Sequence, residues 1–281
     1  MEVFTTTAQL RHHITEFKVK NPNKSIGLVP TMGALHNGHL SLITKSKEQC
    51  DYTIVSIFVN PTQFGPNEDF EKYPKKQEAD LSICQKAEVD VVFMPEIKEM
   101  YPLDFALQTT FNAPKNLTNV LEGKTRPGHF DGVLQVVLKL FNLTQPTKAF
   151  FGQKDAQQLL IIQKMVEDLF LPLTIVPCPI VRTQDGLALS SRNAYLSENG
   201  KKEALKISGA LNAVTKAIMQ GITDSKTLKE VALEVLEGIE VEYLVIVDRE
   251  LKTLPTIKKD STLVLIVARI EDVRLLDNLW F

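Results

Sequence analysis

The sequence predicts an α/β fold, with a parallel sheet covered by helices, followed by a smaller α+β region. Over the first two-thirds of the 281-residue chain, short β-branched or aromatic runs alternate with longer amphipathic segments. This alternation is typical of βα units stacked around a parallel sheet. Prolines at positions 177 and 179 then interrupt the regularity, and the later chain changes to two helical stretches followed by strands. We therefore expect a Rossmann-like domain over residues 1–177 and a smaller α+β lid domain over residues 178–281.

Each predicted element follows from its residue pattern. The strands are short runs rich in β-branched or aromatic residues, expected in order at 26–29, 54–59, 89–94, 149–152, 173–176, 241–247 and 262–268. The helices carry apolar residues at helical spacing, and they are expected at 39–50, 76–86, 132–143, 156–169, 201–219 and 225–238. Asp155 directly precedes the fourth of these helices and is well placed to cap it. This order of elements indicates a fold with nucleotide-binding potential.

The composition excludes several classes of protein. Hydrophobic residues make up 44% of the chain and charged residues 23%, which fits a globular protein and neither a disordered nor a fibrous one. The formal net charge is -2, with both signs scattered along the chain, so we expect no nucleic-acid partner. The three cysteines lie far apart, as is usual for reduced thiols in the cytoplasm. No signal peptide and no membrane span of roughly 18 apolar residues is present, so we expect a cytoplasmic protein.

The segment from Pro30 to His39 leaves the first predicted strand, turns through glycine and enters a helix near its second histidine. A helix N-terminus offers unpaired backbone N–H groups and a partial positive charge, and Gly38 has no Cβ that would block a phosphate. His36 and His39 face one way across the first turn, so both imidazoles could donate to phosphate oxygens. The segment therefore predicts a nucleotide site with chemistry at the α-phosphorus.

Two other interpretations of these histidines stay open. A pair at this spacing could bind zinc, although no third ligand cluster lies near and the cysteines are dispersed. Solvated histidines beside a helix cap would be the simplest interpretation of His-x-x-His alone. The form His-x-Gly-His directly after a first strand is more specific. It resembles the signature of the nucleotidylyltransferase superfamily, which includes class I aminoacyl-tRNA synthetases, and this resemblance implies ATP binding.

Polar side chains also follow the second and fourth predicted strands, where open parallel sheets bind ligands. After the second strand, Gln63 could hold a carboxylate or hydroxyl group, and the alternative is a simple turn at Asn60-Pro61. After the fourth strand, Lys154 is a point charge suited to phosphate. Asp155 beside it either caps the following helix or binds Mg²⁺ directly or through water, and the two roles are compatible.

A further motif lies beyond the expected domain boundary. Ser190, Ser191 and Arg192 follow a predicted turn at Asp185-Gly186 and combine two hydroxyls with a guanidinium. Arginine can bridge two phosphate oxygens, and a mobile second domain could close over ATP and exclude water. The alternative is a loop that ends in a helix cap.

Together these segments closely resemble the pantothenate synthetases, or pantoate–β-alanine ligases. The shared motifs run over most of the chain, at 30–36, 59–64, 126–133, 154–155 and 189–193. The resemblance implies a reaction in two steps, in which pantoate and ATP give pantoyl adenylate and pyrophosphate, and β-alanine then displaces AMP to form pantothenate. It also implies a cytoplasmic homodimer that uses Mg²⁺ and serves coenzyme A biosynthesis.

A carboxylate that attacks a triphosphate brings anions together, so the site must supply positive charge. The side chains expected to supply it are His36, His39, Lys154 and Arg192. The ATP contacts that the resemblance implies are Met32, Gly33, Ala34, Leu35, His36, Asn37, Gly38, His39, Gly152, Gln153, Lys154, Asp155, Val181, Leu189, Ser190, Ser191 and Arg192.

The resemblance also places the other substrates. Gln63 and Gln158 match positions that contact pantoate or β-alanine, and Asp155 is the candidate magnesium ligand. Two positions depart from the family pattern, because Gln153 stands where many members have glutamate and Lys75 where many have arginine. Lysine is a point charge, so a bidentate contact at position 75 is not expected.

Two rival functions are compatible with parts of the sequence. A related adenylyltransferase would pass AMP to a phosphate and keep the dinucleotide as product. The segments around Gln63 and Gln158 would then have no assigned binding role. A catalytically silent nucleotide-binding module or a tRNA-interacting fragment is suggested by the synthetase-like loop. The near-neutral charge and the lack of an extra RNA-binding domain in the sequence count against this second rival.

Overall fold

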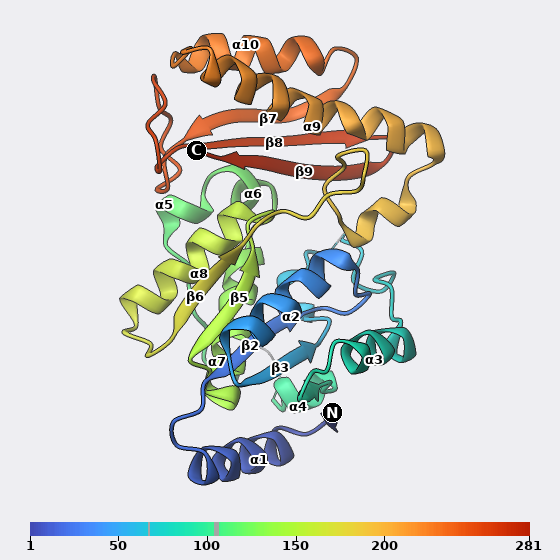
Figure 1. The fold of residues 1–281 in the computed structure, drawn as a ribbon, viewed down its shortest axis with the longest axis vertical. Helices are drawn as coiled ribbons and strands as arrows, with labels where there is room; N and C mark the ends of the chain where they lie inside the picture. Colours follow the sequence, from blue (N-terminus) through green and yellow to red (C-terminus); the bar gives the residue numbers. More distant parts are fainter. Residues whose placement is uncertain (67, 104–106) are drawn as a thin grey trace. The chain divides into compact units, whose positions relative to one another are not determined.

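The computed structural model describes residues 1–66, 68–103 and 107–281, and the chain divides into two compact units (Figure 1). Unit 1 comprises Met1–Gln153 and Gln157–Pro179, and unit 2 comprises Lys154–Ala156 and Ile180–Phe281. Each unit has its own sheet. Within the described ranges, no helix has the length and apolar character that a membrane span requires.

Unit 1 is built on a six-stranded sheet in which all the paired neighbours are parallel. Its strands are β1 (Glu2–Phe4), β2 (Ile26–Thr31), β3 (Tyr52–Ile57), β4 (Val91–Phe93), β5 (Lys148–Gly152) and β6 (Thr174–Cys178), in the order β1-β4-β3-β2-β5-β6. From β2 the chain moves outward through β3 and β4, and later it moves the other way through β5 and β6. The carboxyl ends of β2 and β5 therefore form a topological switch point, where such sheets bind ligands. The predicted α/β parallel sheet is confirmed.

Helices cover this sheet and shape its carboxyl edge. They are α1 (Thr7–Lys20), α2 (Asn37–Gln49), α3 (Gln77–Lys86), α4 (Ile97–Met100), α5 (Lys115–Thr118), α6 (Leu121–Thr125), α7 (His129–Thr144) and α8 (Ala156–Asp168), with a 3-10 turn η1 (Pro61–Gln63). Ile43 of α2 and Cys84 of α3 are fully buried in one cluster with Val29 and Val55 of the sheet. This packing fixes α2 and α3 against the strands whose ends carry the candidate site.

The sequence prediction missed β1 and α1 and placed some helix starts too late. β1 has three residues and lies at the sheet edge, and α1 buries only Leu10 and Ile14, so neither has a strong hydrophobic pattern. The helix expected from residue 39 begins at Asn37, because the His36 side chain caps it. The helix expected from residue 132 begins at His129.

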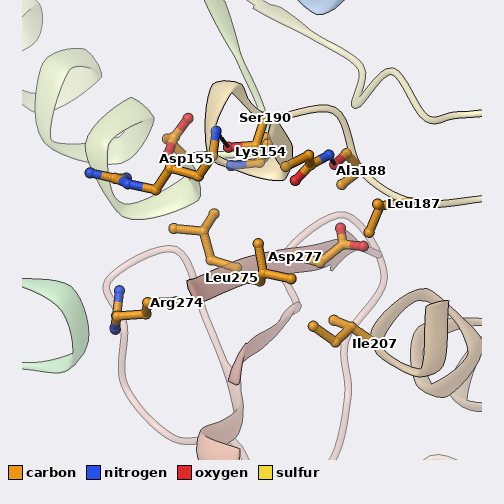
Figure 2. Close-up of a pocket in the computed structure, with 12 residues that line it drawn as sticks. Lys154, Asp155, Leu187, Ala188, Ser190, Ile207, Arg274, Leu275 and Asp277 are labelled. Atoms are coloured by element: carbon orange, nitrogen blue, oxygen red, sulfur yellow. Dashed lines mark hydrogen bonds between the residues drawn. The ribbon is translucent and has the colours of Figure 1, made fainter. Parts of the chain in front are cut away.

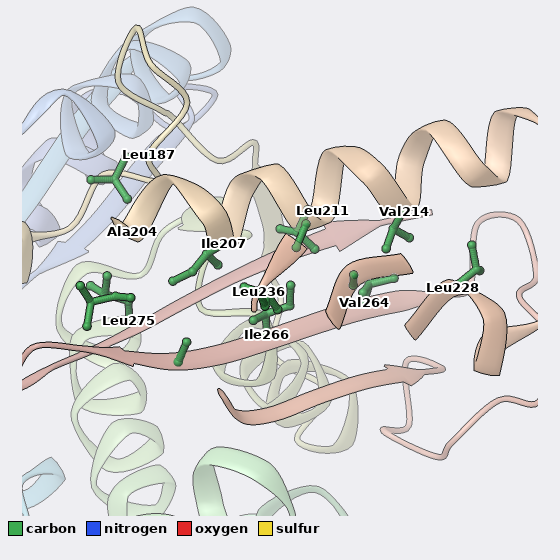
Figure 3. Packing of buried hydrophobic residues seen from close by; sticks show 14 of the residues in the cluster. Leu187, Ala204, Ile207, Leu211, Val214, Leu228, Leu236, Val264, Ile266 and Leu275 are labelled. Carbon is green, nitrogen blue, oxygen red and sulfur yellow. The ribbon is translucent and has the colours of Figure 1, made fainter. Parts of the chain in front are cut away.

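Unit 2 packs two helices on a three-stranded antiparallel sheet (Figure 3). The helices are α9 (Glu198–Met219) and α10 (Ser225–Val235), the strands are β7 (Glu240–Val247), β8 (Leu263–Ile270) and β9 (Val273–Trp280), and a 3-10 turn η3 spans Ser191–Tyr195. Ile207, Leu211 and Val214 line one face of α9 and pack against Val264 and Ile266 of β8. The predicted α+β character is confirmed. β9 was missed because Arg274, Asp277 and Asn278 interrupt its apolar pattern.

Candidate active site

The loop that follows β2 is shaped by bonds to its own backbone and to the neighbouring strand. The Thr31 hydroxyl donates to the Ser56 carbonyl at 2.7 Å and accepts from the Gly33 N–H at 3.2 Å. Gly33 has a φ of 85° and Ala34 a φ of 49°, so the chain passes through two consecutive left-handed residues. Glycine adopts this conformation without a steric penalty, whereas alanine does not. The turn directs the chain from the sheet into α2.

His36 and His39 form a reciprocal cap at the start of α2. The His36 Nδ1 accepts the Gly38 N–H at 3.1 Å, and the His39 Nδ1 accepts the His36 N–H at 3.3 Å. The two ring centroids are 4.1 Å apart. Because each neutral ring accepts through Nδ1, its hydrogen is on Nε2. Each imidazole therefore presents Nε2 as a hydrogen-bond donor, as phosphate binding requires.

This cap corrects one expectation about the loop. The sequence predicted that unpaired backbone N–H groups at the helix start would face a phosphate, but the N–H groups of His36 and Gly38 bond to imidazole nitrogens. The N–H groups of Ala34 and Leu35 are also used, since both donate to the Asp80 carboxylate. These four N–H groups are thus occupied within the protein. Met32 and Asn37 lie in the same segment.

Gln63 lies in η1, after β3, and is 9% exposed. Its Nε2 donates to the Met32 sulfur at 3.2 Å, and its Oε1 accepts from the Asn60 side chain at 3.1 Å. The structure therefore brings the predicted substrate contact Gln63 beside the predicted ATP contact Met32. The Asn60-Pro61 turn, the alternative interpretation, is present as well, and the binding role of Gln63 stays a prediction.

Asn60 is a site residue whose role the sequence did not reveal. It is 1% exposed, its Nδ2 donates to the Gly132 carbonyl at 3.1 Å, and its Oδ1 accepts from the Tyr101 hydroxyl at 2.7 Å. A Cβ on Gly132 would lie 2.2 Å from the Thr62 carbonyl oxygen, so glycine is needed where α7 meets η1. The orientation of the Gln63 amide thus rests on contacts from two distant segments.

The 126–133 motif supports the same turn from the other side. Arg126 forms a bidentate pair with Glu68 at 2.7 and 2.5 Å, and its NH1 bonds to the His129 Nε2 at 3.0 Å. The His129 Nδ1 therefore donates to the Gln63 carbonyl, at 2.7 Å. Burial, followed by the Arg126 charge, lowers the pKa of His129 to about 4. Burial raises the pKa of Glu68, but the bond and charge of Arg126 outweigh it, and that pKa lies below its usual value.

The strand and helix at the other side of the switch point contribute Gly152, Gln153 and Gln158. Gly152 ends β5, and the Gln153 N–H donates to the Cys178 carbonyl at 2.8 Å, continuing the sheet pairing. Gln158 is half-buried on α8, next to the buried Gln157. Gln157 accepts from the Glu122 N–H at 3.0 Å and so ties α6 to α8.

A hollow in unit 2 collects the remaining predicted phosphate contacts (Figure 2). Its lining includes Lys154, Asp155, Ser190, Arg192 and Arg274. Ser190 caps η3 by accepting the Arg192 N–H at 3.3 Å. Arg274 was not predicted, because it comes from β9, a strand that the sequence pattern did not reveal. The hollow thus gathers cations from three separate parts of the chain.

A buried ion pair holds the chain segment that leads to this hollow. Arg182 donates to both carboxylate oxygens of Asp277, at 2.5 and 2.9 Å, and Asp277 is 4% exposed. The Leu189 N–H donates to the Val181 carbonyl at 3.0 Å, so these two predicted ATP contacts pair across one turn. Ser191 begins η3 directly afterwards. The ion pair connects this turn to β9 and was also missed by the sequence prediction.

Comparisons with known proteins identify the family of this chain. The family model described as pantoate-beta-alanine ligase matches residues 2–280. The pantothenate synthetase of Wolinella succinogenes is 59% identical over 280 residues, which is 100% of each chain. A pantothenate synthetase structure from Thermus thermophilus is 40% identical, with a TM-score of 0.92 over 100% of this chain and 99% of that one.

A second solved structure adds ligands to the comparison. The pantoate-beta-alanine ligase of Francisella tularensis, crystallised in complex with Beta-gamma ATP and Beta-alanine, is 36% identical to this chain. Its TM-score is 0.82, over 100% of this chain and 97% of that one. With the family model covering nearly every residue and a relative at 59% identity over the full length, this chain belongs to the pantoate–β-alanine ligase family.

Proposed function

We propose that this protein condenses pantoate with β-alanine to pantothenate through a pantoyl adenylate, converting ATP to AMP and pyrophosphate. The observation that carries the proposal is the capped pair of His36 and His39 at the switch point of a parallel sheet, with both Nε2 atoms as donors. Family membership and the ATP and β-alanine bound by a relative at 36% identity support it.

In the first step a pantoate carboxylate oxygen attacks the α-phosphorus of ATP. The new O–P bond forms as the bond to the β-phosphate bridging oxygen breaks, and pyrophosphate leaves. Negative charge grows on the phosphate oxygens in this step, and donors already oriented toward it lower the barrier. We assign this role to His36 and His39 in unit 1 and to Lys154 and Arg192 in unit 2.

The pantoate end of the site is assigned to Gln63 and Gln158. Bonds to Asn60 and Met32 fix the rotamer of the Gln63 amide, and a fixed amide can orient a small hydroxy acid. Its partner Met32 belongs to the proposed ATP loop, so this contact links the two proposed binding regions. In the second step the amine of β-alanine attacks the acyl carbon of the adenylate, AMP leaves with the C–O bond electrons, and the nitrogen loses a proton to solvent. No enzyme nucleophile is needed.

Magnesium is proposed to bind with ATP near Asp155. This carboxylate is exposed and lines the hollow beside Lys154, so it fits an ion held directly or through water. When bound, Mg²⁺ would neutralise part of the triphosphate charge. Lys154 and Arg192 would hold the same phosphates from the protein side.

We further propose that the protein is a cytoplasmic homodimer, as its family resemblance implies. All three cysteines are free thiols, which fits a reducing compartment. Sedimentation equilibrium of the purified protein tests the dimer, because a mass near 31.5 kDa at micromolar concentration would contradict it and twice that mass would support it.

The experiment that tests the function mixes protein, ATP and Mg²⁺ with pantoate and follows pyrophosphate, then adds β-alanine and follows AMP. We expect a burst of pyrophosphate near one equivalent per site and AMP only after the amine is added. Absence of pyrophosphate in the presence of pantoate would overturn the proposal. An adenylyltransferase would instead consume ATP with a phosphorylated acceptor and would release no AMP.

A further inference from the structure

A buried carboxylate outside the predicted site contacts the proposed ATP loop. Asp80 lies on α3 and is 2% exposed. Its Oδ2 accepts the Ala34 N–H at 2.9 Å, and its Oδ1 accepts the Leu35 N–H at 2.7 Å. Each carboxylate oxygen thus has its own backbone donor in the turn that precedes His36.

This carboxylate is held without a cation. Among the side chains in the described ranges, no Lys, Arg or His forms an ion pair with Asp80. A buried charge is costly unless hydrogen bonds compensate it, so the two N–H groups are what hold the carboxylate inside. Consecutive backbone N–H groups around left-handed residues form a concave anion site. In this protein the anion in that concavity is Asp80, and phosphate must find its donors elsewhere.

The contact also explains a strained residue. Ala34 has a φ of 49°, a left-handed conformation that is sterically unfavourable for an L-residue other than glycine. Such strain persists only where the surroundings over-determine it. The Asp80 bonds on Ala34 and Leu35, together with the Thr31 bond on Gly33, fix three successive N–H groups. The turn is therefore clamped directly before the residue that caps α2.

We propose that Asp80 is a positioning residue for adenylation, which holds the 33–35 turn so that the imidazole of His36 is correctly placed. The proposal rests on the proposed function. A displacement of about 1 Å at a catalytic group can cost on the order of 100-fold in rate. Because Asp80 acts through His36 and does not touch substrate, its loss should lower the rate of adenylation more than the affinity for ATP.

The test begins with Asp80→Asn, which keeps the shape of the side chain but places an NH₂ donor against one of the two N–H donors. We expect single-turnover pyrophosphate release to fall about 30-fold, while the ATP dissociation constant changes less than about threefold. A matched control is Cys84→Ala on the same helix. Burial and the Asp80 charge raise the pKa of Cys84 to about 12, so the control removes an uncharged, fully buried thiol. It should leave the rate within about threefold.

A double-mutant cycle separates positioning from general damage to the fold. In a His36→Asn background, which retains an oxygen for the helix cap, Asp80→Asn should cost less than about twofold, because the group that it positions is gone. A full 30-fold loss in that background would overturn the proposal. The proposal would also be overturned if Asp80→Asn alone released pyrophosphate at the wild-type rate.

The contact between Asp80 and the N–H groups of Ala34 and Leu35, called the clamp below, is measured independently of activity. The amide ¹⁵N–¹H signals of Ala34 and Leu35 should shift in Asp80→Asn and stay in place in Cys84→Ala. Unchanged amide signals in Asp80→Asn would show that Asp80 does not hold the 33–35 turn. If the wild type releases no pyrophosphate, the proposed function fails, and these amide signals still report whether the clamp exists.

Discussion

The two regions that carry the proposed phosphate contacts are built differently. In unit 1 the loop from Met32 to His39 is one continuous segment, and its shape comes from bonds between its backbone, its own histidines and one carboxylate. In unit 2 the hollow gathers Lys154, Arg192 and Arg274 from three segments that a buried ion pair helps to hold. A contiguous motif can thus orient its donors locally, whereas a dispersed one depends on tertiary contacts.

The largest effect expected from this comparison is at His36. Asparagine is among the best N-cap residues, so His36→Asn should keep α2 while removing the Nε2 donor. We expect turnover to fall by roughly two to four orders of magnitude, the size usual for a lost stabiliser of developing charge. Steady-state pantothenate formation measures the rate, and urea unfolding should show a free energy of unfolding close to that of the wild type.

His36→Ala is the matched comparison for the cap. It should be as inactive as His36→Asn and in addition less stable by about 1 kcal/mol, because the N-cap acceptor is lost. If His36→Asn retained near-wild-type turnover, the local motif would be a helix cap with no role in the chemistry.

The next effect concerns the dispersed site. Arg192→Ala should slow pyrophosphate release about 100-fold under single-turnover conditions, because a charged donor to the phosphates is lost. Arg192→Lys should recover part of the rate, since lysine restores the positive charge but cannot form the bidentate hydrogen bonds of a guanidinium. Equal pyrophosphate bursts in wild type and Arg192→Ala would show that the hollow does not bind the triphosphate.

The tertiary dependence of the hollow is tested at Asp277. Asp277→Asn weakens a bidentate pair with Arg182 and should lower the free energy of unfolding by about 2 kcal/mol, less than a fully buried pair because the arginine is partly hydrated. The control Glu250→Gln disrupts the exposed pair with Lys252 and should leave the free energy of unfolding nearly unchanged. Equal losses in urea unfolding would mean that the buried pair does not stabilise the hollow.

The same contrast explains how much the sequence could predict. The parallel sheet and the α+β unit follow from local patterns, so the sequence predicted them, whereas the cap formed by His36 and His39 was only an alternative interpretation of these histidines. Gln63 and Met32 were both predicted as contacts, but their bond was not, because pairing across 31 residues leaves no local signal. The structure places the predicted residues in their two units, and their roles remain proposals.

The missed residues share a physical reason. Asp80 looks like an ordinary acidic residue in the first turn of a helix, and only its burial against the loop reveals a clamp. Arg274 and Asp277 lie on β9, and its polar residues interrupt the apolar pattern from which a strand is recognised. For Asn60 the sequence offers only an alternative turn at Asn60-Pro61, because no sequence pattern shows which distant groups an amide meets.

The smallest expected effect concerns a tertiary contact in unit 1, between His129 and the Gln63 carbonyl. His129 has a pKa of about 4 in the folded protein, against about 6.5 when unfolded. Between these values the unfolded chain binds more protons, so stability falls as the pH is lowered. From pH 7 to pH 5.5 this histidine should account for a loss of about 1 kcal/mol. Urea unfolding at both pH values should show a smaller loss for His129→Gln, whereas His12→Gln on an exposed face of α1 should behave like the wild type. Equal losses in all three proteins would mean that the neutral His129 contact to Gln63 does not stabilise the fold.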